Sequence, residues 1–121
     1  MNAVLQVETA LAAASAENAA RRLAKQVVRE SFEFEKLHEY RDATGQPVYF
    51  RWRVRKDSGE KVIRPMHYNG TAYVAGEPAA PATGKLLYRL PELLAADPAA
   101  PVFIVEGEWC ADHLHALPSR R

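Results

Sequence analysis

The sequence predicts an α+β protein in which an N-terminal helix is followed by an antiparallel meander of three or four strands and then by a short β-α-β-α segment. Apolar residues recur every three or four positions over residues 3–30, which is the spacing of a helix with one packed face. From Ser31 the spacing changes to two, the period of a half-buried strand, and turns rich in aspartate and glycine follow. The 121 residues suit one compact domain, with a helical segment at 1–30, the meander at 31–74, a linker at 75–84 and the β/α segment at 85–121.

The helical pattern has two runs whose phase slips near Ser15, so either one helix or two short helices would satisfy it. The apolar positions are Val4, Val7, Leu11 and Ala14 in the first run, and Ala16, Ala20, Leu23 and Val27 in the second. The second run also carries four cations, Arg21, Arg22, Lys25 and Arg29. These cations form either the solvated face of a packed helix or a contact surface for nucleic acid.

The first hairpin is predicted at Asp42-Ala43-Thr44-Gly45, which is typical of a type I turn followed by a left-handed glycine. Closing this loop between Asp42 and Gln46 fixes the register of both strands. One face then holds Phe32, Phe34, His38 and Tyr40, with Phe34 opposite Val54, His38 opposite Phe50 and Tyr40 opposite Val48. On the other face Glu33 would meet Arg55 and Glu35 would meet Arg53, which pairs acid with base.

Two further turns extend the meander. Asp57-Ser58-Gly59 predicts a hairpin that closes between Lys56 and Glu60 and places Val54 opposite Val62. Asn69-Gly70 predicts a third, two-residue turn, although Pro65 weakens the strand before it. We expect Phe50 and Trp52 to lie in the core.

Short elements alternate in the C-terminal third of the sequence. Leu86-Leu87-Tyr88 predicts a strand, and Leu90-Pro91-Glu92 begins a short helix with proline in its first turn. The unbroken apolar run Val102-Phe103-Ile104-Val105 is typical of a strand buried on both faces. After Gly107, a helix from Glu108 to Leu117 is expected to turn Cys110, Leu114 and Leu117 inward.

The segment from Pro101 to Glu108 carries the most specific chemical signal. Glu106 would lie at the carboxyl end of a buried strand, next to the free amides of a helix N-terminus, where a phosphate or a metal could bind. This segment resembles the first motif of toprim domains. Three pieces occur in the same order as in the toprim primases and primase-helicases of phages and plasmids, which the chain resembles over residues 37–117. The first piece runs from Glu39-Tyr40 through Arg55. The second is Leu87-Tyr88-Arg89-Leu90-Pro91-Glu92-Leu93-Leu94, and the third runs from Ile104 to Glu108.

The resemblance implies that Glu106 matches the toprim glutamate, which acts in proton transfer during nucleotidyl transfer. The likeness stops before the family's metal-binding Asp-x-Asp motif, which this sequence lacks, and Trp109 stands where the family carries a small or basic residue. Two-metal chemistry needs clustered carboxylates, and Glu106 and Glu108 stand nearly alone. We therefore expect no cofactor and no catalysis by this chain by itself, with Glu106 as a relic or a structural carboxylate, and magnesium only if another chain completes the site.

A second candidate site is the strand face that bears Tyr49, Arg51, Arg53 and Arg55, together with the nearby cations Lys56 and Arg64. Alternate residues of one strand lie about 6.6–6.8 Å apart, so their guanidinium groups repel one another unless anions are close. Those anions are either the phosphates of a single-stranded nucleic acid, with Tyr49 stacked on a base, or the carboxylates of Glu33 and Glu35.

Composition limits the choice of partners. Sixteen basic and fifteen acidic residues give a net charge of +1, which excludes a strong overall attraction to DNA or to an anionic membrane. The charge is uneven, because residues 51–64 carry six cations and two anions whereas residues 77–118 carry two cations and six anions. These two parts either attract each other or meet separate partners.

Cysteine usage and hydropathy indicate the compartment. The single cysteine, Cys110, cannot form an intrachain disulfide, which favours a reducing cytoplasm. The N-terminus lacks the pattern of a signal peptide, and no run approaches the roughly 20 apolar residues of a membrane span. Cys110, His113 and His115 offer too few ligands for a metal site.

The sequence thus predicts a nucleic-acid-associated accessory protein, a toprim-primase-like fragment of a phage or mobile element connected with DNA replication and non-catalytic alone. One alternative is a small inhibitor, for example of the anti-CRISPR type, that acts by protein–protein binding. Another is a part of a primase or nucleotidyltransferase that a second chain completes. The expected partner is single-stranded nucleic acid, or an acidic or nucleic-acid-binding protein, and not a membrane. Because a strand at residues 102–105 would leave an open sheet edge, we also expect a homodimer or coverage by the N-terminal helix.

Overall fold

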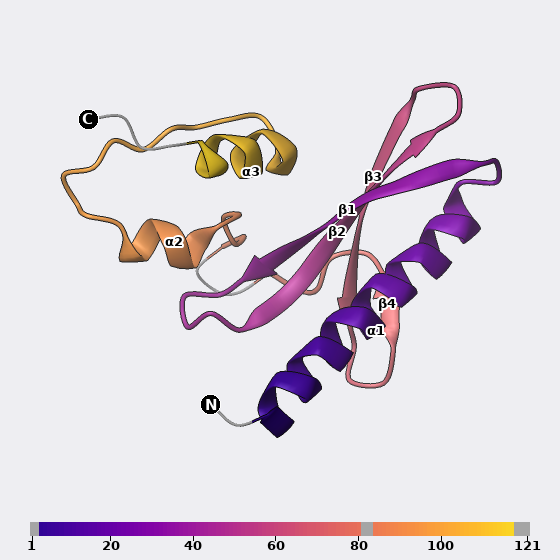
Figure 1. The fold of residues 1–121 in the computed structure, drawn as a ribbon, viewed down its shortest axis with the longest axis horizontal. Coiled ribbons are helices and arrows are strands. Elements are labelled where there is room, and N and C mark those ends of the chain that lie inside the picture. Colours follow the sequence, from indigo (N-terminus) through magenta and orange to yellow (C-terminus); the bar gives the residue numbers. More distant parts are fainter. Residues whose placement is uncertain (1–2, 81–83, 118–121) are drawn as a thin grey trace.

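The computed structural model describes residues 3–80 and 84–117, with the backbone alone over residues 3–14. The elements follow one another as α1 (Ala3–Val27), β1 (Phe32–Arg41), β2 (Pro47–Lys56), β3 (Lys61–Tyr68), β4 (Tyr73–Ala75), α2 (Leu90–Ala95) and α3 (Glu108–Ala116). Figure 1 shows α1 lying across the strands, while α2 and α3 lie together at the other side of the molecule. The predicted α+β class, with its N-terminal helix and meander, is confirmed.

The hydrophobic core lies between α1 and one face of the sheet. Alanines four residues apart, Ala16, Ala20 and Ala24, are almost fully buried and let the helix backbone approach the strands closely. The sheet contributes its largest buried side chains at Trp52, Met66 and Val54. The prediction that Phe50 and Trp52 are core residues is confirmed, and α1 is one helix that continues through Ser15.

The sheet is an antiparallel meander with the strand order β1-β2-β3-β4. Both predicted hairpin closures are present: the Asp42 amide donates to the Gln46 carbonyl at 2.9 Å and the Lys56 amide donates to the Glu60 carbonyl at 2.8 Å. Gly45 adopts φ of 87°, the left-handed conformation that this loop requires.

The remaining turn differs from its prediction. The Asn69 amide donates to the Ala72 carbonyl at 3.0 Å, so the two-residue loop is Gly70-Thr71, one residue later than the expected Asn69-Gly70. The Asn69 side chain also accepts from the amides of both Thr71 and Ala72 at 2.9 Å, which stabilises this loop.

The predicted register is correct only for the first part of β1. Phe34 lies opposite Val54 as expected, but Glu35 is a bulge and Lys36 is the next residue to pair, opposite Arg53. A bulge turns every later side chain to the other face. His38 therefore lies opposite Arg51 and Tyr40 lies opposite Tyr49, and a second irregularity follows between Tyr40 and Arg41. The expectation that His38 and Tyr40 share a face with Phe32 and Phe34 was wrong.

The C-terminal part forms helices without the predicted strands. The two helices α2 and α3 are present, but in the described chain neither residues 86–88 nor residues 102–105 form a strand, so no β-α-β-α segment is seen. A strand needs a neighbour to receive its backbone hydrogen bonds. Val102, Phe103 and Ile104 instead stay 65%, 69% and 95% exposed.

The expected inward face of α3 was also wrong. Cys110, Leu114 and Leu117 are exposed, whereas Glu108 is buried and Asp112 points toward the sheet. The reason is that the sheet face covered by α3 is basic, and it takes carboxylates in preference to leucines.

Candidate functional site

Two arginines of β2, Arg53 and Arg55, bind the carboxylate of Glu35 on β1. The Nε atom of Arg53 donates to Oε1 of Glu35 at 2.9 Å, and the Nε atom of Arg55 donates to Oε2 of the same residue at 3.0 Å. The bond from Arg53, followed by that from Arg55, holds the pKa of Glu35 below its ordinary value against the opposing effect of burial. Glu35 can serve both arginines because the bulge places it between them.

The acidic C-terminal part packs on the same basic face. An Nη atom of Arg51 donates to Oε2 of Glu108 at 3.2 Å, and Glu108 is itself buried. The guanidinium group of Arg53 lies 4.4 Å from the ring centroid of Trp109, close enough for a cation–π interaction. The oppositely charged parts of the sequence therefore contact each other, which is one of the two outcomes expected from the charge pattern.

Tyr49 lies in an internal stack. It is 8% exposed, and its ring lies 4.4 Å from that of Tyr40 with 13° between the ring planes. Of the two remaining candidate cations, Lys56 lies 3.5 Å from Glu60, and Arg64 is exposed and donates to the carbonyl of Ile63. Of the six candidate binding residues, Tyr49 and Arg53 are buried, and Arg51, Arg55 and Lys56 are partly exposed and each paired with a carboxylate of the chain. Arg64 is exposed.

A buried polar network ties α3 to β1. The side chain of His38 is 1% exposed, and its Nδ1 atom lies 3.2 Å from Oδ2 of Asp112 and 3.3 Å from the hydroxyl of Tyr88. Tyr88 donates to Oδ1 of Asp112 at 2.9 Å, and Arg89 donates to the same oxygen through two nitrogens. One carboxylate therefore joins His38 of β1 to the adjacent residues Tyr88 and Arg89.

The pKa values in this network follow from its burial. Burial lowers the pKa of His38, and the nearby carboxylates of Asp112 and Glu108 only partly offset this. Burial, and then the bond to Asp112, raise the pKa of Tyr88. Burial alone would raise the pKa of Asp112, but the bonds from Tyr88 and Arg89 outweigh it and hold that pKa below its ordinary value. These pKa directions favour a neutral His38 beside an ionised Asp112.

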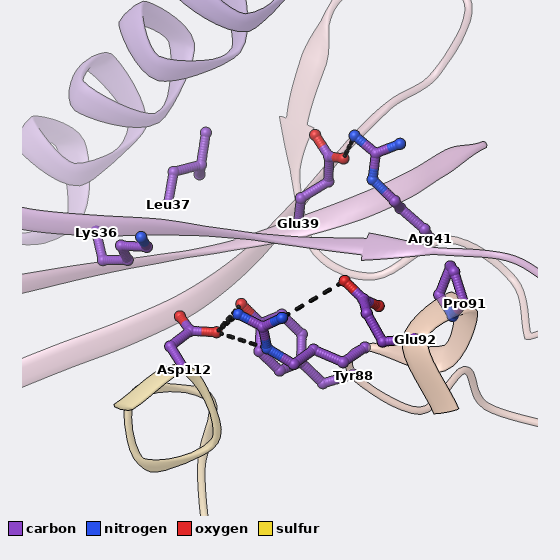
Figure 2. Close-up of a pocket in the computed structure, with 9 residues that line it drawn as sticks. Lys36, Leu37, Glu39, Arg41, Tyr88, Pro91, Glu92 and Asp112 are labelled. Carbon is purple, nitrogen blue, oxygen red and sulfur yellow. Dashed lines mark hydrogen bonds and ion pairs between the residues drawn. The ribbon is translucent and has the colours of Figure 1, made fainter. Parts of the chain in front are cut away.

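A pocket of about 210 Å³ opens next to this network, between β1 and the start of α2. Asp112 and Glu92 both pair with the guanidinium group of Arg89, and Figure 2 shows Glu39 paired with Arg41 on the strand. Arg89 is the one non-glycine residue in the described chain with positive φ, at 61°, a conformation that its ion pairs to Asp112 and Glu92 hold in place. Most of the charges in this pocket are satisfied within the chain.

Glu106 lies apart from these groups. It is exposed in a bend just before α3, with no strand leading into it. Within the described residues, no group of three or more histidine, cysteine, aspartate or glutamate side chains is arranged to hold a metal ion. Cys110 is exposed, and His113 contacts the carbonyl of Trp109 in its own helix.

The cations of α1 form a separate, open surface. Arg21 lies 3.7 Å from Glu17 and covers the ring of Phe34. Arg22, Lys25 and Arg29 are exposed, and no carboxylate among the side chains described from residue 15 onward lies within 4 Å of them. Arg22 and Lys25 lie within about 60° of each other around the helix axis, and Arg29 follows just beyond the last turn. We call these three residues the α1 basic stripe.

Sequence reasoning identified Glu35 as a partner of Arg53 but missed its bond to Arg55, and it missed the network around Asp112. The signal for Glu35 was the alternation of acid and base on adjacent strands. Asp112 carried no comparable signal, because its three partners lie 23, 24 and 74 residues away along the chain.

No family model matches the chain, and comparisons with curated proteins and with solved structures found no match. No helix in the described part of the chain is long and apolar enough to cross a membrane.

Proposed function

We propose that this chain is a nucleic-acid-associated accessory module without catalysis of its own, related to the toprim-like primases of phages and mobile elements. The observation that carries the proposal is the α1 basic stripe, a set of exposed cations with no carboxylate partner among the described side chains. The proposed ligand is the phosphate backbone of single-stranded nucleic acid, which such cations bind without reading sequence.

The stripe is better placed for this role than the strand arginines. Arg51, Arg53 and Arg55 each already contact a carboxylate, so a phosphate would have to displace Glu35 or Glu108. Lys56 is likewise paired, with Glu60, so Arg64 remains as the secondary contact on the sheet, together with Lys56 if a phosphate displaces Glu60. Glu106 stands by itself and supports no metal-dependent step.

The test is the salt dependence of binding to a fluorescently labelled oligothymidylate, measured by anisotropy. Each phosphate contact with a single strand contributes about 0.7 to the slope of log K against log salt, so the three cations predict a slope near −2. The triple variant Arg22→Gln/Lys25→Gln/Arg29→Gln should lose most of this slope. The control Arg41→Gln/Lys85→Gln removes two cations that are already paired and should retain it. Equal loss in both variants, or no binding by the wild type, would refute the proposal.

A second candidate is a small inhibitor that binds another protein, and the exposed apolar residues of the 102–105 segment favour it. Saturable binding to a protein partner after nuclease treatment would support this function.

A third candidate is a primase part completed by another chain that supplies the Asp-x-Asp motif. Magnesium-dependent primer synthesis that appears only when both chains are mixed would support that one.

A further inference from the structure

The strongest unexplained surface is the apolar segment Val102–Val105, which we call the free strand segment. Its residues are 65%, 69%, 95% and 39% exposed, in chain order. Together the four residues expose on the order of 500 Å², which is in the range of the largest apolar patch of a monomer. Figure 1 shows the chain here as an extended path from α2 to the start of α3.

The backbone of this segment is also available. The backbone hydrogen bonds found in this part of the described chain close the turns before and after it, at Ala100 and at Ala111, and none involves residues 101–106. Valine, phenylalanine and isoleucine are the residue types that favour strands. The segment therefore has the side chains and the free amides and carbonyls of a strand, and lacks only a neighbour.

Charge identifies the kind of neighbour. Residues 90–117 contain five carboxylates and no lysine or arginine. Glu108, Asp112 and Glu92 are turned toward arginines of the chain itself. Glu106 directly follows the apolar run and Asp97 lies five residues before it, and neither has an ion pair among the described side chains. The Asp97 carboxylate accepts from the amide of Ala99. A partner strand flanked by lysine or arginine would meet these two carboxylates.

A second copy of the chain fits less well. A symmetric pair of free strand segments would bring the acidic ends of both copies together and would offer no cation from either segment. A strand from another protein with lysine or arginine at its ends would supply these cations.

We propose that the free strand segment is a docking site for an extended, apolar segment of another protein flanked by basic residues, which adds to it as a β-strand. This mode of recognition gains affinity from backbone hydrogen bonds and specificity from alternate side chains. This docking site is separate from the proposed nucleic-acid contact. The α1 basic stripe belongs to the helix that packs on one face of the sheet, whereas the free strand segment leads into α3, which packs on the other face.

The experiment uses the whole chain and two labelled synthetic peptides with the same alternating valine and threonine core, one flanked by lysines and the other by glutamates. Binding is followed by anisotropy without nucleic acid, and hydrogen exchange reports the amides of residues 102–105. We expect the lysine-flanked peptide to bind at least ten times more tightly than the glutamate-flanked one and to protect these amides.

Two variants separate this site from other surfaces. Ile104→Pro removes a backbone donor at a fully exposed position and should abolish peptide binding. Leu94→Ala, an uncharged change at an exposed leucine of α2, should leave it intact, as should the triple variant of the α1 basic stripe. The proposal is overturned by failure of the lysine-flanked peptide to bind, by equal binding of both peptides, or by self-association of the wild type that Ile104→Pro abolishes.

Discussion

Replacing Glu35 by alanine tests the ionic side of the sheet most directly. Its carboxylate is 17% exposed and receives Nε donors from both Arg53 and Arg55. The side chain of Arg53 is only 8% exposed, so Glu35→Ala leaves a buried guanidinium group with the ring of Trp109 as its main remaining contact.

The expected cost is about 3 kcal/mol, at the lower end of the range for breaking a buried ion pair, because water reaches part of the carboxylate. For a chain of this size that corresponds to a fall in melting temperature of roughly 10–15 °C. Urea unfolding followed by circular dichroism measures the free energy directly. Glu33→Ala is the matched control, since Glu33 is an exposed glutamate of the same strand for which no ion pair is found among the described side chains.

The double variant Glu35→Ala/Arg53→Met should recover much of the lost stability, because it removes the buried charge that has no carboxylate partner and leaves an apolar side chain against Trp109. If Glu35→Ala costs no more than Glu33→Ala, or if the double variant is less stable than the single one, the buried ion pair does not stabilise this face and the reasoning fails.

Three other predictions follow from the same structure. The depressed pKa of His38 means that the unfolded chain takes up a proton before the folded one does as the pH falls. The stability that the neutral His38 contributes is therefore present above about pH 6.5 and is lost as the pH falls through the folded pKa. Melting temperatures measured from pH 7.5 to 5 should show this loss, and His38→Asn should flatten the dependence of melting temperature on pH in this range. Trp52→Ala should cost about 3–5 kcal/mol, since Trp52 is 1% exposed under α1; a cost below about 1 kcal/mol in urea unfolding would contradict the position of the core. Gly45→Ala should cost about 1 kcal/mol through its φ of 87° alone, because a Cβ there meets no atom within 4 Å, and an unchanged melting temperature would show that the loop relaxes.

Local sequence rules predicted much of the meander. The loops after Arg41 and Lys56 carry aspartate and glycine at the positions that close a turn, and both closures are present. The apolar pair Phe34 and Val54 then set the correct register near the start of β1. These features depend only on neighbouring residues and on one strand pair.

The bulge at Glu35 could not be predicted in the same way. The alternation of apolar and charged residues does break there, because Glu35 and Lys36 are both charged and Leu37 is out of phase with Phe34. Counting by two through Glu35 passes over this break and assigns His38 to the wrong face. The bulge is stabilised by two arginines of the next strand, and such a contact enters a prediction only after the register is known.

The C-terminal part shows a different limit. The apolar pattern of Val102–Val105 is the same whether the segment is a buried strand or is exposed to solvent. Hydropathy records the preference of these residues for burial and does not record whether a neighbouring strand is present. The inward face of α3 failed for a related reason: the surface beneath it is basic, so carboxylates rather than leucines face inward, and that surface is assembled from distant residues.

The bulge in β1 also gives the sheet two unlike sides. One side is apolar and is covered by the alanines of α1. The other is held by ion pairs in which one member is largely buried, since the side chains of Glu108, Arg53 and Asp112 are 8%, 8% and 16% exposed. Salt screens such pairs far less than exposed ones, so moderate salt should leave the acidic C-terminal helices on the sheet.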